Sequence, residues 1–112
     1  MISRIWHGYT TKRNADTYEN LLKSEIFVGI KNRNITGYRG IQLLRRELDS
    51  ETEFITIMWF DSLDSVKIFA GPEYEKAVVP EKAQKVLKRF DPASQHYSVL
   101  VENFNNNNFN VV

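Results

Sequence analysis

The spacing of hydrophobic and polar residues changes several times along the chain, and each change predicts a different element. Residues 2–11 (ISRIWHGYTT) are rich in β-branched and aromatic types without a helical period, which predicts a first strand. A helix is predicted from about Ala15 to Ser24, capped by Asn14, because Ala15, Tyr18, Leu22 and Ile26 recur at helical spacing. Residues 28–36 mix glycine, asparagine and lysine and predict a connection.

Two strand-like runs, residues 37–47 and 53–60, flank the polar stretch from Leu48 to Thr52 and predict an antiparallel hairpin. With a turn centred near Ser50, residues whose numbers sum to about 100 face each other. Both faces then carry apolar residues, which indicates a second layer on the side away from the helices. The first predicted face holds Ile41, Leu43, Ile55, Ile57 and Trp59, with Arg45 opposite Glu53; the second holds Gln42, Leu44, Thr56, Met58 and Phe60.

The second half of the chain predicts two helices and a last strand. One helix follows Asp61 and Ser62 and ends at Gly71, and another begins at Pro80. Residues 96–101 (HYSVLV) predict the fourth strand. The order predicts an α+β, ferredoxin-like βαββαβ domain over residues 1–102, an antiparallel four-stranded sheet with helices on one face, whose first and last strands are neighbours. Residues 103–112 form an asparagine-rich C-terminal tail without a core pattern.

Composition narrows the classes of partner. The chain has 112 residues, 42% of them hydrophobic, and a net charge of +1, which fits one domain and gives no basic field for nucleic acid. It has no cysteine and no long apolar run, so we expect a cytoplasmic protein with no membrane contact. A domain this small leaves apolar surface that a second copy can cover, which favours a homodimer.

Several short motifs, spread over residues 2–101, together resemble the antibiotic biosynthesis monooxygenase superfamily. They are Trp6-His7-Gly8, Gly37-Tyr38-Arg39-Gly40, Glu53-Phe54 with Trp59 and Ser62, Phe69-Ala70-Gly71, Ala77-Val78 with Pro80, and His96-Tyr97. The resemblance implies a dimeric α/β barrel, and the superfamily includes cofactor-independent oxygenases of polycyclic phenols and haem-degrading enzymes. The asparagine, tryptophan and histidine of the haem-degrading branch fall here on Trp6 or His7, near Phe69 and near Val79. Haem cleavage by that triad is therefore not expected, while haem binding stays open.

The two histidines are the first candidates for catalysis. If residues of the outer strands whose numbers sum to about 103 pair, His7 and His96 lie side by side and could act as a general base, with Tyr9 as a hydrogen-bonding partner. The alternative is that each is a hydrogen-bonded histidine of the sheet. No metal site is predicted, because no third histidine or cysteine accompanies them.

A pocket for a small-molecule ligand is predicted on the face that carries Tyr9 and His7, with Gln42, Thr56 and Met58 as substrate-binding residues. The alternative is a dimer core filled by water or by the partner. Three functions follow: a cofactor-independent monooxygenase acting on a small aromatic or apolar substrate, a non-catalytic dimer that binds or senses a small ligand such as haem, and a purely structural dimer whose tail contacts a partner.

Overall fold

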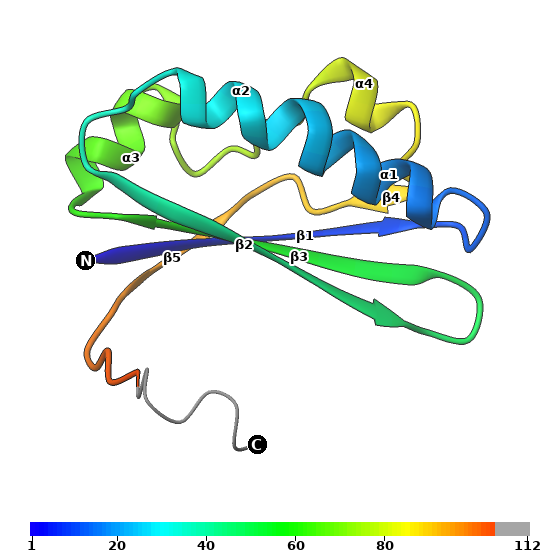
Figure 1. Cartoon of the computed structure of the whole chain (residues 1–112). Coiled ribbons are helices and arrows are strands. Elements are labelled where there is room, and N and C mark those ends of the chain that lie inside the picture. Colours follow the sequence, from blue (N-terminus) through cyan, green and yellow to red (C-terminus); the bar gives the residue numbers. More distant parts are fainter. Residues whose placement is uncertain (105–112) are drawn as a thin grey trace.

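A computed structural model describes residues 1–104 of the chain, and a layer of helices covers one face of an antiparallel sheet (Figure 1). The sheet contains β1 (Ile2–Thr10), β2 (Tyr38–Glu47), β3 (Thr52–Phe60), β4 (Arg89–Phe90) and β5 (Gln95–Ser98). The helical segments are α1 (Ala15–Leu21), a π-helical turn (Leu22–Ile26), α2 (Phe27–Asn32), α3 (Leu63–Ala70) and α4 (Glu81–Gln84). The α+β class and the helices on one face are as predicted; most of the tail, residues 105–112, lies outside the described residues.

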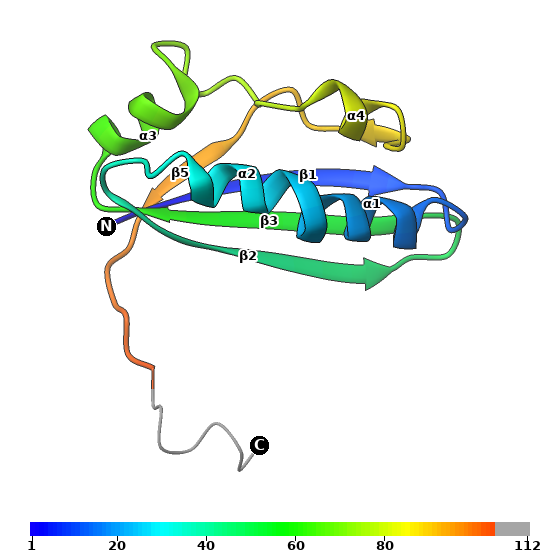
Figure 2. The ribbon, with the colours of Figure 1, turned by 45° about the horizontal axis from the view of Figure 1, so that its top comes forward.

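The sheet has the strand order β2, β3, β1, and the outer edge of β1 is shared by two short strands. β5 pairs with the beginning of β1 and β4 with its end, so the predicted neighbourhood of the first and last strands is confirmed. Figure 2 shows β2, β3 and β1 side by side, with α1 and α2 in front of them. Within residues 1–104, no helix lies on the opposite face of the sheet (Figure 1), which residues 99–104 border only beside Gln42 and Trp59. We call this side the open face and the other the helix face.

The register of the hairpin differs by one residue from the prediction. Ile41 pairs with Met58 and Leu43 with Thr56, so the paired numbers sum to 99. The cause is the turn: the amide of Leu48 donates to the carbonyl of Glu51 at 2.9 Å, which leaves only two residues in the loop. Ile41, Leu43, Thr56 and Met58 therefore share the helix face, and Gln42, Ile55, Ile57 and Trp59 share the open face.

The first helical segment is longer than predicted. It continues from α1 through the π-helical turn and α2 to Asn32, although its last residues have weak helix propensity. Asn14 stands at the N-cap position, but its side chain donates to the carbonyl of Val86 instead of capping the helix. Packing explains why the helix persists: Tyr18 and Leu22 are buried, and Phe27 and Ile30 of α2 are partly buried against the two core clusters.

The core on the helix face has two parts. Phe54 and Tyr18 pack edge to face, with ring centroids 4.9 Å apart, beside Ala15, Leu22 and Ala83. Phe60, Met58, Val66 and Ile35 form the second cluster. Gly8 lets the Trp6 ring pack closely against the strand, since a Cβ added at Gly8 would lie 3.0 Å from that ring.

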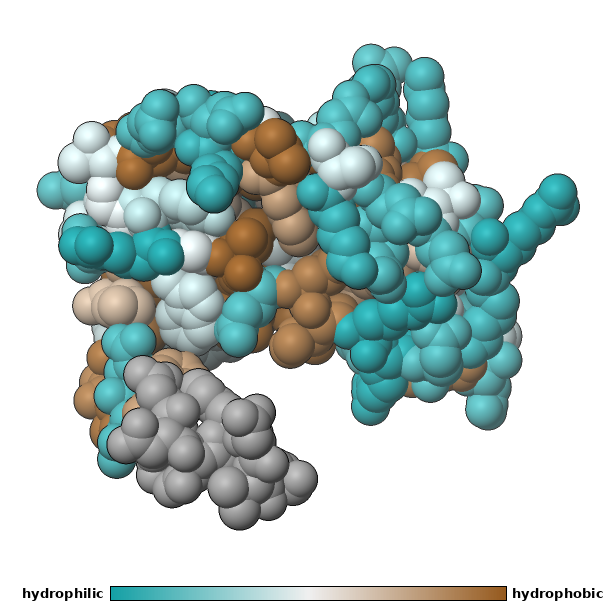
Figure 3. Space-filling model, in the orientation of Figure 1, coloured by the Kyte–Doolittle hydropathy of each residue, from teal (hydrophilic) through white to brown (hydrophobic). Residues whose placement is uncertain are grey.

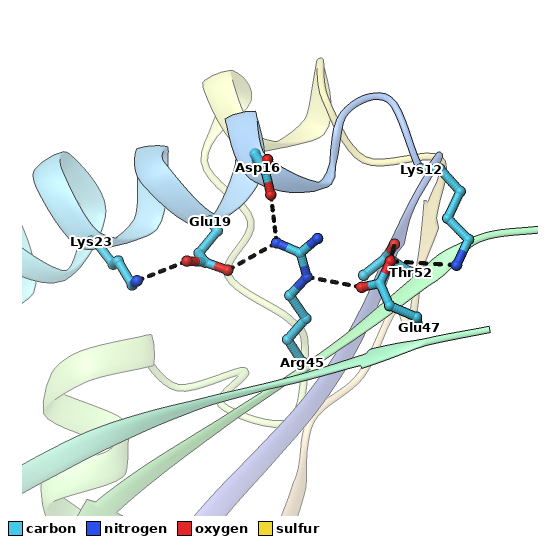
Figure 4. Close-up of polar contacts among 7 residues, drawn as sticks. All are labelled: Lys12, Asp16, Glu19, Lys23, Arg45, Glu47 and Thr52. Atoms are coloured by element: carbon cyan, nitrogen blue, oxygen red, sulfur yellow. Dashed lines mark hydrogen bonds and ion pairs between the residues drawn. The ribbon is translucent and has the colours of Figure 1, made fainter.

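A network of ion pairs joins α1 to β2 at the hairpin end of the molecule. The guanidinium of Arg45 contacts Asp16 at 2.7 Å, Glu19 at 3.0 Å and Glu47 at 2.9 Å (Figure 4). Arg45 thus faces the helices, and its pairing partner on β3 is Phe54, whereas Glu53 pairs with Arg46. The prediction that Arg45 opposes Glu53 was wrong for the same one-residue reason.

Candidate functional site

An apolar cavity lies between the sheet and the helices, and its wall comes from both layers. Its free volume is about 70 Å³. The sheet contributes Arg4, Trp6, Ile41, Thr56 and Met58; the helical segments and the loops contribute Tyr18, Leu22, Ile26, Phe27, Ile30, Phe69, Val78, Val79, Pro80, Ala83 and Ser94. An apolar wall with a few polar groups is the composition of a small-molecule site.

The π-helical turn supplies part of this wall. Leu22 and Ile26, its first and last residues, both line the cavity. A π-helical turn inserts an extra residue into the helix, and such turns occur frequently at functional sites. The helical spacing of these two residues is visible in the sequence, but the irregular turn is not, because helical periodicity implies a constant number of residues per turn.

Arg4 is the charged residue of the cavity wall, and it is only 4% exposed. Its Nη1 donates to the carbonyl of Tyr74 at 2.5 Å and to Nε2 of His96 at 2.9 Å, and its Nη2 donates to the carbonyl of Lys76 at 3.3 Å. Burial lowers the pKa of Arg4 to about 10. Its guanidinium also lies 5.5 Å from the centre of the Phe69 ring.

Three other polar side chains line the cavity. Tyr18 is buried, and burial raises the pKa of its hydroxyl. Thr56 and Ser94 contribute hydroxyls from β3 and from the segment before β5. Trp6 presents its ring to the cavity while its indole nitrogen donates to the carbonyl of Asp91 at 2.7 Å. The wall therefore offers hydrogen-bonding groups around an apolar space.

The predicted substrate-binding residues divide between the two faces. Thr56 and Met58 line the cavity on the helix face, whereas the predicted pocket lay on the face of Tyr9 and His7; their role in substrate binding stays a prediction. Gln42 pairs with Ile57 and lies on the open face, so the expectation that these three share one pocket was wrong. The reason is the two-residue turn, which moves β2 by one position against β3 and so reverses the face of each residue.

The two histidines do not lie side by side. His96 pairs with Arg4, and the numbers of paired residues in β1 and β5 sum to 100, not 103. His96 lies beside Arg4 and packs edge to face against Tyr74, with the two ring centroids 5.2 Å apart. Burial, and then the charge of Arg4, lower the pKa of His96, while Glu75 acts in the opposite direction.

His7 and Tyr9 lie on the open face, outside the cavity. Nδ1 of His7 is 3.4 Å from Glu53, and the hydroxyl of Tyr9 donates to the same carboxylate oxygen at 3.3 Å. Burial opposes ionisation of Glu53, but hydrogen bonds from Arg46 and His7 hold the pKa of Glu53 below its usual value. This cluster is a set of mutually satisfied polar groups, and catalytic roles for His7, Tyr9 and His96 stay predictions.

Arg4 is the residue that the sequence analysis missed. Because side chains alternate along a strand, Arg4 shares a face with Trp6 and Gly8, and an arginine on a face that packs against helices is the signal in the sequence that points to it. Within residues 1–104, no group of three or more histidine, cysteine or acidic side chains is arranged to hold a metal ion. In the same part of the chain, no helix has the length and apolar character that crossing a membrane requires.

Several solved structures have the same arrangement, and two of them are described here. A Bacillus cereus protein provisionally assigned as an antibiotic biosynthesis monooxygenase superposes with a TM-score of 0.66 at 11% identity, over 93% of this chain and 97% of its own. The haem degrader MhuD of Mycobacterium tuberculosis, with two haems bound in its active site, has a TM-score of 0.57 at 16% identity, over 93% and 100%.

The chain has the antibiotic biosynthesis monooxygenase fold. The resemblance found in the sequence is confirmed at this level. A scan of protein-family models and a search of curated sequences find no match to the chain. The antibiotic biosynthesis monooxygenase fold fixes the architecture around the cavity, and the reaction has to be argued from the residues of the cavity itself.

Proposed function

We propose that the chain binds a small aromatic substrate in the cavity between the sheet and the helices and oxidises it as a cofactor-independent monooxygenase. The observation that carries the proposal is the cavity itself, apolar and ringed by Phe69, Trp6 and Met58, with the hydroxyls of Tyr18 and Thr56 in its wall. The fold shared with a protein provisionally assigned as an antibiotic biosynthesis monooxygenase supports the reaction class.

The size of the cavity constrains this substrate. A cavity of ~150 Å³ holds benzene, and the free volume here is about 70 Å³. An aromatic ligand must therefore displace side chains of the wall. The π-helical turn and the irregular segment that carries Val78 and Val79 are two parts of the wall without regular α or β hydrogen bonding. We place the displacement there.

Oxygen uptake with 1-naphthol tests the reaction. The substrate supplies all four electrons: its O–H and C4–H bonds break, one oxygen atom becomes the second carbonyl of 1,4-naphthoquinone, and the other leaves as water. The protein need only hold the substrate and keep water out. We expect chelator-treated protein to consume one O₂ per quinone formed. Ala83→Leu should lose turnover, because the larger side chain fills the cavity from a position that is only 2% exposed.

The outcomes separate the functions. Thermal stabilisation by 1-naphthol without oxygen uptake would indicate a binding or sensing module instead of an enzyme. Circular dichroism checks that Ala83→Leu is folded. His7→Gln with His96→Gln tests the predicted base: turnover unchanged by removal of both imidazoles would end that assignment. Haem, the alternative ligand, requires a larger displacement than a two-ring substrate, and the structure does not favour it.

We also infer that two copies associate through the open face. Its centre is apolar, with Ile5, Ile55, Ile57 and Trp59 partly exposed and Leu44 and Tyr97 exposed. Figure 3, which views the sheet from its side with the helices above, shows hydrophobic surface near the middle of the molecule and hydrophilic surface at the hairpin end. A sheet with apolar residues on both faces is completed by a second layer, and a second copy supplies one.

Sedimentation velocity tests the association. Ile57→Lys places a charge in the open face and should convert the dimer to a monomer. Ile68→Lys, on α3 and 56% exposed, is the matched control and should sediment as the wild type. A wild-type protein that is monomeric at micromolar concentrations, or an Ile57→Lys dimer, would contradict the inference.

A further inference from the structure

Arg4 carries a positive charge that no described residue neutralises. Its hydrogen-bond partners are two backbone carbonyls and one imidazole nitrogen. Since an arginine has only donors, Nε2 of His96 must accept, and a His96 that accepts at Nε2 is neutral. Within residues 1–104 Arg4 forms no ion pair. Glu75 acts on the pKa of His96, but Glu75 is exposed and forms no ion pair with Arg4.

A buried, unpaired charge is costly, and proteins normally pair it with an opposite charge or place it where a ligand brings one. Four of the exposed arginines pair with carboxylates: Arg39 with Asp61, Arg45 with three carboxylates, Arg46 with Glu53 and Arg89 with Glu51. Arg4 is more buried than any of them, yet it faces an apolar cavity.

The position of Arg4 also suits recognition. Its guanidinium is held by the carbonyls of Tyr74 and Lys76, which fix its orientation without using its charge. Its hydrogen bonds come from Nη1 and Nη2, and Nε donates none within the described residues. Donor capacity is therefore left for a ligand, beside the ring of Phe69.

We propose that the cavity takes an anionic aromatic ligand, a carboxylate or phenolate, whose charged oxygens pair with Arg4 while its ring lies against the apolar wall. This proposal rests on the proposed function for the location of the site, and it specifies in addition that the ligand is negatively charged. It assigns Arg4 to binding and specificity.

The probes are 2-naphthoate and 2-naphthamide, which have nearly the same shape and differ in charge at pH 7.5. Isothermal titration should show the wild type binding the carboxylate at least about tenfold more tightly than the amide, because a hydrogen bond between two charged groups is stronger than one to a neutral group. Arg4→Met, which keeps the length and removes the charge, should abolish this preference. Replacing a buried charge by an apolar residue of similar size is usually tolerated, so the variant should fold.

Arg33→Met is the matched control. The guanidinium of Arg33 lies 5.2 Å from the same Phe69 ring, but Arg33 is exposed and does not line the cavity. It should keep the full preference for the carboxylate. Arg4→Lys should keep part of it, since the charge remains and the planar fork is lost.

The results separate this inference from the proposed function. If the wild type binds both probes equally, or if Arg4→Met keeps the preference, the charge assignment is wrong while the aromatic site stands. If neither probe binds the wild type, both proposals are overturned for ligands of this size. If Arg33→Met loses the preference as Arg4→Met does, the effect is a general electrostatic one, and the assignment to Arg4 fails.

Discussion

Gly37, at the entry to β2, offers a test of the fold whose magnitude can be worked from two separate effects. Its φ of +83° lies in the region that side-chain-bearing residues avoid, and adopting it costs an alanine ~1–2 kcal/mol. A Cβ at this position would overlap Oγ of Ser65 and lie 2.8 Å from its Cβ, and overpacking of this kind costs ~1–3 kcal/mol. Gly37→Ala should therefore lower the free energy of unfolding by about 2–5 kcal/mol.

The structure around Gly37 makes relief difficult. Its carbonyl accepts from the amide of Asp61 at 2.8 Å, and Ser65 is buried in α3, where its amide donates to the cap residue Ser62. Moving either backbone would disturb the link between β2, β3 and α3. At ~4 °C per kcal/mol for a chain of this size, the midpoint of thermal unfolding should fall by about 8–20 °C.

Gly29→Ala is the control for this substitution. Gly29 lies in α2 and an added Cβ would meet no atom within 4 Å, so alanine should stabilise the protein by ~0.5–1 kcal/mol. Both variants are measured by thermal and urea unfolding at one protein concentration, because association makes the midpoint concentration-dependent. A Gly37→Ala variant within ~0.5 kcal/mol of the wild type would refute the left-handed, crowded geometry at this position.

Two further predictions concern charge. The pKa of His96 is lower in the folded state, so as the pH drops below ~6.5 the imidazole is protonated in the unfolded chain before it is protonated in the folded one. The free energy of unfolding should therefore decrease between pH 7.5 and pH 5.5, and it should decrease less in His96→Gln. Urea unfolding at both pH values measures this. Carboxylates contribute mainly below that window. Arg45→Gln should lower the free energy of unfolding by about 1 kcal/mol or less at low salt, and its difference from the wild type should shrink in 1 M NaCl. Arg39→Gln, which breaks a pair with a single carboxylate, should lower it by less. Equal losses in the two variants would contradict a network effect at Arg45.

The class and order of the elements could be predicted from the sequence because they depend on local periods. The hydrophobic spacing around Tyr18, the cap at Ser62 and the stop at Gly71 each act within a few residues. Ser62 does accept from the amide of Ser65, and Gly71 has a φ of +89°, as a helix-ending glycine should. Such signals can be recognised in a short stretch of sequence, because they do not depend on contacts with the rest of the molecule.

The candidate site could not be predicted with the same accuracy, because it depends on register. Whether Thr56 lies beside Gln42 or beside Leu43 is decided by one residue in the turn, and strand propensity is the same for both. The pairing of His96 with Arg4 depends on how the chain passes from β4 to β5, around Pro92. Thr56 and His96 could be named as candidate site residues from the sequence, but their neighbours in the sheet are known only from the structure.

This one-residue dependence also separates the two surfaces of the sheet. Thr56 and Ile57 are adjacent in the chain, yet Thr56 lines the cavity and Ile57 lies on the open face. Along β1 the same alternation gives Arg4 to the cavity and Ile5 to the open face. Changes at Arg4 should therefore alter ligand preference without altering association, and changes at Ile57 should do the reverse. If Ile57→Lys monomers also lost the preference for 2-naphthoate, the wall of the cavity would have to depend on the second copy, and the two surfaces would be one coupled site.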